Sequence, residues 1–189
     1  MTASPAISSA PIEGGLLASS DVTTVLGEIR STYGKLVRSG RIHGLMICDA
    51  DARVLAVDLF FDNKVSTWDL AALAAATFGV AKQARLFFDA LGAKELERGS
   101  LVFDGLQLFV AQAGTVPGQK GDQGKPKELL LVALADKGAN FGLITLQMRK
   151  YAPRVQQTVA EAAKCQNLDV PERELHMILE SAKTGGLFK

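Results

Sequence analysis

The longest regular pattern in the chain is a run of apolar and small residues that predicts one long helix over residues 67–91. Between Asp69 and Lys82 the only polar side chain is that of Thr77. A surface helix normally has an apolar stripe on one side and charged residues on the other. A helix that lacks charge on both sides must be covered on both sides, so the pattern predicts a second covering surface.

The two sides of this helix differ in the size of their residues. At about 100° per residue, one side carries the residues that we expect to cover a sheet: Leu70, Leu73, Thr77, Ala81, Ala84 and Phe88. The other side is a ledge where another backbone can approach closely, and its residues form the predicted dimer interface: Ala72, Ala75, Ala76, Gly79, Gln83 and Leu86. The simplest occupant of the ledge is a second copy of the chain, which gives a homodimer. Burial by the chain's own residues is the alternative. The apolar run is shorter than the roughly 20 residues that cross a bilayer, and charges bracket it, so we expect no membrane insertion.

Other helices and strands flank the long helix. Apolar residues at helical spacing follow a cap at Ser20 or Asp21, and Gly40 ends this first helix. Five segments have the apolar character of strands: residues 42–48, 54–60, 100–103, 106–112 and 129–135. The sequence Asp104-Gly105 joins two of them and predicts a type I′ hairpin turn.

The resulting order is helix, two strands, long helix, three strands and helix. Consecutive strands with short links favour antiparallel pairing, so we predict an α+β layered domain over residues 20–163. Its last helix begins near Gly142, and Pro153 is expected to kink or break it. Residues 1–19, rich in Ser, Ala, Pro and Gly, are predicted to be a disordered tail. Residues 164–189 form a C-terminal extension with a short amphipathic helix, which either packs back on the domain or docks onto a partner.

The composition excludes several classes of function. The 189 residues fit one domain with tails, and the net charge of +1 with 6% aromatic residues disfavours nucleic-acid binding. The only two cysteines, Cys48 and Cys165, indicate no disulfide framework. Because no basic segment followed by an apolar core begins the chain, we expect a cytoplasmic protein.

Residues typical of catalysis or of cofactor binding are scarce. The segment 114–127 holds glycines and lysines, but Pro126 stands where a phosphate-binding loop needs a hydroxyl, and a strand follows instead of a helix. We expect a mobile loop there, with lysines that could contact an acidic partner. His43 and His176 have no cysteine, histidine or carboxylate at metal-ligand spacing. The sequence therefore predicts a non-catalytic protein with no metal and no cofactor.

Three segments, taken in order, resemble the Roadblock/dynein light-chain family. The first strand reads Gly-Leu-Met-Ile-Cys-Asp at residues 44–49, and the long helix contains Leu-Ala-Ala-Leu-Ala-Ala-Ala at residues 70–76. The last strand, residues 130–136, leads into Ala-Asn-Phe-Gly-Leu-Ile at residues 139–144, which is similar to the family's junction between final strand and final helix. The long 114–127 segment and the C-terminal extension depart from the family's pattern.

This resemblance implies a five-stranded antiparallel sheet between the long helix and the two terminal helices. It also implies a homodimer that joins sheets edge to edge and sets the long helices side by side. The implied function is to bind and regulate, or to position, a Ras-like small GTPase. Phe78, Lys82 and Arg85 are the predicted contacts, although the two charges also fit ordinary solvated helix residues. One alternative is an architectural adaptor of a motor or signalling complex, with no effect on a GTPase cycle. Another is a small-molecule sensor that uses the sheet as its pocket wall.

Overall fold

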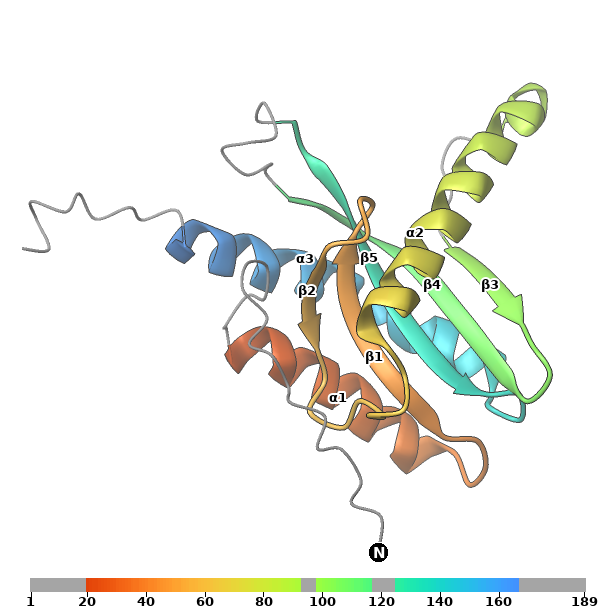
Figure 1. Ribbon diagram of the computed structural model, residues 1–189, viewed down its shortest axis with the longest axis vertical. Helices are drawn as coiled ribbons and strands as arrows, with labels where there is room; N and C mark the ends of the chain where they lie inside the picture. Colours follow the sequence, from red (N-terminus) through yellow and green to blue (C-terminus); the bar gives the residue numbers. More distant parts are fainter. Residues whose placement is uncertain (1–19, 93–97, 117–124, 167–189) are drawn as a thin grey trace, which may run out of the picture.

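The computed structural model describes residues 20–92, 98–116 and 125–166. A five-stranded antiparallel sheet with the strand order β2-β1-β5-β4-β3 lies between one long helix and two terminal helices (Figure 1). The elements are α1 (Ser20–Leu36), β1 (Ile42–Asp49), β2 (Val54–Val57), α2 (Thr67–Ala84), a 3₁₀ helix η1 (Arg85–Leu91), β3 (Arg98–Val102), β4 (Leu106–Val116), β5 (Lys127–Asp136) and α3 (Phe141–Gln166). This arrangement confirms the predicted α+β class and the three layers.

Alternating side chains divide the interior into two cores, one on each face of the sheet. In β5, Leu129 and Leu131 face α1 and α3, whereas Leu130 and Val132 face α2. Successive residues of a strand point to opposite faces, so a central strand that is covered on both faces is apolar throughout. All four of these side chains are fully buried, as the continuous apolar pattern predicts.

The structure corrects two predicted boundaries on the α2 side of the domain. The α-helix ends at Ala84 and continues as a 3₁₀ helix to Leu91, where one continuous helix was predicted. Strand β2 ends at Val57 and not at residue 60, because the next residue, Asp58, turns into the domain and forms a salt bridge with Arg30.

The hairpin between β3 and β4 forms where it was predicted, but its turn type differs. The backbone N–H of Phe103 donates to the carbonyl of Leu106 at 2.8 Å. A type I′ turn needs positive φ at both central residues, whereas here only Gly105, at +86°, has it.

Helix α3 runs through Pro153 without a break, so of the predicted kink or break the structure excludes the break. Pro153 is exposed, while Met148 and Val155 in the flanking turns are buried against the sheet and α1. Packing on both sides of the proline therefore holds the helix across the missing hydrogen bond. The helix extends to Gln166, beyond the expected domain end at residue 163. The predicted N-terminal tail, the 117–124 part of the loop and residues 167–189 of the extension lie outside the described residues.

Candidate interaction surface

Helix α2 lies across the sheet and buries one narrow stripe against it. Ser66 caps the helix, its Oγ accepting from the backbone N–H of Asp69 at 3.2 Å. The buried side consists of Leu70, Ala71, Ala74 and Phe78. This stripe is rotated from the predicted one, since Leu73, which was expected to cover the sheet, is 38% exposed.

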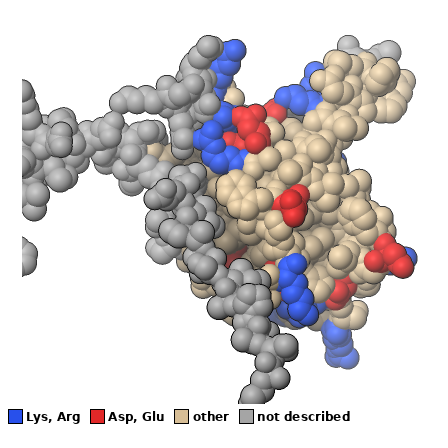
Figure 2. Space-filling model, in the orientation of Figure 1, with Lys and Arg blue, Asp and Glu red and all other residues tan. Residues whose placement is uncertain are grey.

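The opposite side of α2 is exposed and uncharged over most of its length. We call it the outer α2 surface and define it by its exposed residues: Ala72, Leu73, Ala76, Gly79, Val80, Gln83 and Leu86. Large apolar side chains extend it at both ends, with Trp68 54% exposed and Phe87 84% exposed. In Figure 2 this part of the molecule is a broad tan area that continues along the projecting end of α2 and η1. Contiguous exposed apolar surface of this kind marks interaction sites in soluble proteins.

Five of the six predicted dimer-interface residues belong to the outer α2 surface. Ala72, Ala76, Gly79, Gln83 and Leu86 are all exposed, and a Cβ built on Gly79 would meet no atom within 4 Å. Ala75 is half-buried and packs against the α2-side core. The ledge of small residues is therefore present and open in the single chain.

The three predicted partner contacts have different environments. Phe78 is only 3% exposed and faces the sheet, so its side chain offers no surface to a partner in this structure. The ammonium of Lys82 forms an ion pair with Glu128 of β5 at 2.7 Å. Arg85 is half-buried at the junction of α2 and η1.

The two edges of the sheet differ in the surface that borders them. Strand β2 has 4 residues, whereas β3 has 5, and the apolar side chains of its last residue, Val102, and of the next residue, Phe103, are exposed. The exposed end of α2 projects over the β3 side of the sheet (Figure 1). The projecting apolar end of α2 and the β3 edge of the sheet thus lie on the same side of the molecule.

His43 lies in a polar cluster that ties the loop before α2 to the ends of β1 and β5. Its Nε2 is 2.6 Å from Asp136 and its Nδ1 is 3.4 Å from Asp62. The pKa of Asp62 is lowered by the backbone N–H of Lys64 and, less strongly, by His43. The pKa of Asp136 is lowered by the backbone N–H of Arg41 and then by His43. The cluster gives His43 a structural role, with a carboxylate near each ring nitrogen.

Little in the described part of the chain suggests chemistry. Among residues 20–92, 98–116 and 125–166, no group of three His, Cys, Asp or Glu side chains is arranged to hold a metal ion. Burial, with the charge of Asp49 as a second cause, raises the pKa of the Cys48 thiol to about 12, which makes it a poor nucleophile. No helix in those same residues is long and apolar enough to span a membrane.

Comparison with solved structures identifies the fold. A Roadblock/LC7 domain from Streptomyces avermitilis superimposes with a TM-score of 0.51 at 20% identity, covering 69% of this chain and 93% of that one. An MglB structure with a tetrameric arrangement gives a TM-score of 0.55 at 18% identity, covering 79% and 97%. The gliding protein MglB from Thermus thermophilus gives 0.51 at 19% identity, covering 81% and 98%. No family model and no curated protein sequence matches the chain. The chain therefore has a Roadblock-like fold, as its sequence resemblance implied.

Sequence reasoning missed several exposed residues beside the predicted interface. Leu73 and Val80 belong to the outer α2 surface, and Trp68 extends it at its start. A search for large apolar residues on the small-residue side would have found Val80, which lies one residue after Gly79. Trp68 stands before Asp69, outside the charge-free run, and was overlooked for that reason.

Proposed function

We propose that this chain is a non-catalytic, dimeric regulator or scaffold that binds a Ras-like small GTPase through a pair of α2 helices. The observation that carries the proposal is the outer α2 surface, which is uncharged and exposed on a helix whose inner side already covers the sheet. The Roadblock-like fold supports it, because the sequence resemblance ties this fold to GTPase regulation. A cytoplasmic location belongs to the same proposal.

The dimer we propose pairs the β3 edges and sets the two outer α2 surfaces against each other. Small residues at Ala72, Ala76 and Gly79 allow two helix backbones to approach closely, and Leu86 adds apolar area at the rim. An exposed edge strand presents unpaired backbone groups that a second edge can satisfy. Burial of apolar surface stabilises such a contact by about 25 cal/mol per Å² before the costs of association.

The GTPase would dock where the paired helices present their remaining polar groups. Arg85 and Lys82 supply positive charge at the end of α2, and Glu128 holds Lys82 in place. Phe78 is assigned a supporting role beneath this surface, since it is buried.

Solution mass tests the dimer directly. Light scattering over a concentration series should give about twice the 20.1 kDa of the chain. Gly79→Glu places a charge on the outer α2 surface without a clash inside the protomer, and should yield a folded monomer. Gly34→Glu is the matched control, because Gly34 is also an exposed helical glycine whose Cβ position has no atom within 4 Å. A stable monomer of the wild-type chain, or an unchanged mass of Gly79→Glu, would refute the paired-helix arrangement.

Binding to a panel of Ras-like GTPases, loaded with GDP or with a GTP analogue, tests the partner. Arg85→Glu should weaken binding at unchanged solution mass. Lys82→Glu alone would also repel Glu128, so the double exchange Lys82→Glu with Glu128→Lys is the better test, because it can restore the ion pair. If neither variant changes binding, the α2 docking site is wrong.

If truncation after Gln166 abolishes partner binding while the dimer persists, the adaptor alternative is correct.

A further inference from the structure

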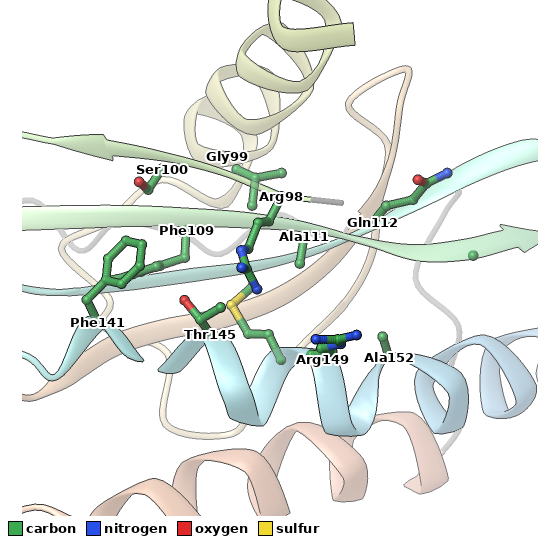
Figure 3. Close-up of a pocket in the computed structure, with 13 residues that line it drawn as sticks. Arg98, Gly99, Ser100, Phe109, Ala111, Gln112, Phe141, Thr145, Arg149 and Ala152 are labelled. Carbon is green, nitrogen blue, oxygen red and sulfur yellow. The ribbon is translucent and has the colours of Figure 1, made fainter. Parts of the chain in front are cut away.

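A groove of about 500 Å³ lies on the face of the sheet opposite α2, between α3 and the strands β3 and β4 (Figure 3). Its position follows from the widths of the elements. Five strands about 4.8 Å apart make a sheet wider than two helices of about 10 Å each can cover. Helices α1 and α3 cover the other strands on this face, and β3 is left beside α3 without a helix above it.

The floor of the groove is formed by the strands β3 and β4. Strand register places Ser100 opposite Phe109 and Arg98 opposite Ala111, and these side chains face α3. The rings of Phe109 and Phe141 pack at 5.5 Å at one end.

Gln156 borders the other end of the groove. A Cβ at Gly114 would lie 2.3 Å from its side chain, and Gly114 has a φ of +96°. The positive φ favours glycine at this position, and the close atoms belong to the terminal amide of the Gln156 side chain.

Two arginines from opposite walls supply the charge among the described residues of the lining. Arg98 projects from β3 and Arg149 from α3, and none of the lining residues in the described part of the chain is Asp or Glu. Within residues 20–92, 98–116 and 125–166, neither guanidinium has an ion-pair or hydrogen-bond partner in a described side chain. Guanidinium groups bind carboxylates through paired, charge-assisted hydrogen bonds. Met148 on the α3 wall adds an adaptable apolar contact.

We propose that this groove binds a small amphipathic carboxylate, with its anionic head between Arg98 and Arg149 and its apolar body along Phe141 and Met148. The volume falls within the roughly 300–1,000 Å³ of small-ligand sites. The groove and the outer α2 surface lie on opposite faces of the sheet, so this proposal does not rest on the proposed function.

Dodecanoate below its micelle concentration is a suitable probe, with dodecylammonium as a cation of the same chain length. Calorimetry should show that dodecanoate binds the full chain at least tenfold more tightly than dodecylammonium. Arg98→Gln with Arg149→Gln should weaken dodecanoate binding about tenfold to hundredfold. The control Arg38→Gln with Lys64→Gln removes two exposed cations elsewhere and should change binding less than twofold.

Methionine methyl resonances locate the bound probe. Met148 lines the groove, whereas Met46 lies in the core on the other face of the sheet. Dodecanoate should shift the Met148 resonance and leave that of Met46 unchanged. Thr145→Trp, which fills the groove from the α3 wall and leaves the β3 edge untouched, should abolish this shift at unchanged solution mass.

Three results would overturn the proposal. They are equal affinity for dodecanoate and dodecylammonium, full affinity in the double arginine variant, and a changed solution mass of Thr145→Trp, which would make the groove an interface between copies. None of them affects the tests of the α2 surface.

Discussion

Both faces of the sheet are covered by helices, but only the α1/α3 face has an outer surface typical of a monomer. There, α1 and α3 turn charged residues outward, and the two are joined by an ion pair between Arg154 and Glu28. On the other face α2 is the only α-helix in the described residues, and its outer surface is uncharged from Ala72 to Gly79.

The two faces differ in the charge around their exposed apolar residues more than in the presence of such residues. Helix α3 also exposes an apolar side chain, that of Leu146, but the charged residues Arg149 and Lys150 follow it within the next turn. On α2 the exposed residues from Ala72 to Val80 include no charge, and Lys82 is the first charged residue after them. The length of the uncharged exposed stretch therefore distinguishes the two faces better than the number of exposed apolar residues.

The largest expected effect separates the inner from the outer side of α2. Phe78→Ala removes a buried ring and should lower the free energy of unfolding by about 3–5 kcal/mol. Phe87→Ala removes an 84% exposed ring and should change it by less than about 0.5 kcal/mol. Urea unfolding measures both changes in the free energy of unfolding. The Gly79→Glu background is used because this variant is expected to be a monomer, so that dissociation of a dimer does not contribute. Equal effects of the two changes would mean that Phe78 does not anchor α2.

The second prediction concerns the outer side of α3. Pro153→Ala restores a backbone donor in a helix that is already continuous, and should raise the free energy of unfolding by about 1–3 kcal/mol. Because Pro153 lies on the α1/α3 face, solution mass should not change. Thermal unfolding with light scattering checks both parts, and a loss of stability would show that α3 depends on a bend at this residue.

The order of the elements and the layers could be predicted from the sequence because strand alternation and helical spacing are local signals. The face of α2 was harder to assign. In a run such as residues 70–76, where alanine dominates, rotation of the helix by one residue changes little in hydrophobicity. Phe78 was therefore placed on the partner side, although contact with the sheet buries it.

The groove beside α3 could not be predicted from local patterns. Arg98 and Arg149 are far apart in the sequence, and each alone resembles an ordinary surface charge. They meet because β3 pairs with β4 and α3 crosses the same face, which only the fold determines.

A third, smaller effect compares how readily the two layers open. Cys48 lies under α2, and at pH 8 a pKa of about 12 leaves about one thiol in ten thousand ionised. Alkylation therefore requires the layer to open. Two variants are compared, both in a Cys165→Ser background: one keeps Cys48, and the other carries Cys48→Ala with Ala133→Cys. Cys48 should react about tenfold faster than the thiol introduced at position 133, because Ala133 lies under two helices. Mass spectrometry follows both reactions, and a slower reaction at Cys48 would show that the single-helix layer is the tighter one.

The smallest effect concerns the polar cluster that fastens the loop before α2 to the sheet. His43→Ala should raise the pKa values of Asp62 and Asp136 toward 3.8, but not fully, because the backbone N–H groups of Lys64 and Arg41 still donate to them. Carboxylates whose pKa is lowered by folding stabilise the folded state above the pKa of the unfolded chain, and this contribution is lost as the pH falls through the folded-state pKa. The variant should thus be slightly less stable at neutral pH, and its stability curve should meet that of the wild type in strong acid. Carboxyl ¹³C titration of the two aspartates measures the shifts directly. Unchanged pKa values would mean that the backbone donors alone hold the loop, and that the α2 layer is fastened to the sheet without help from the histidine.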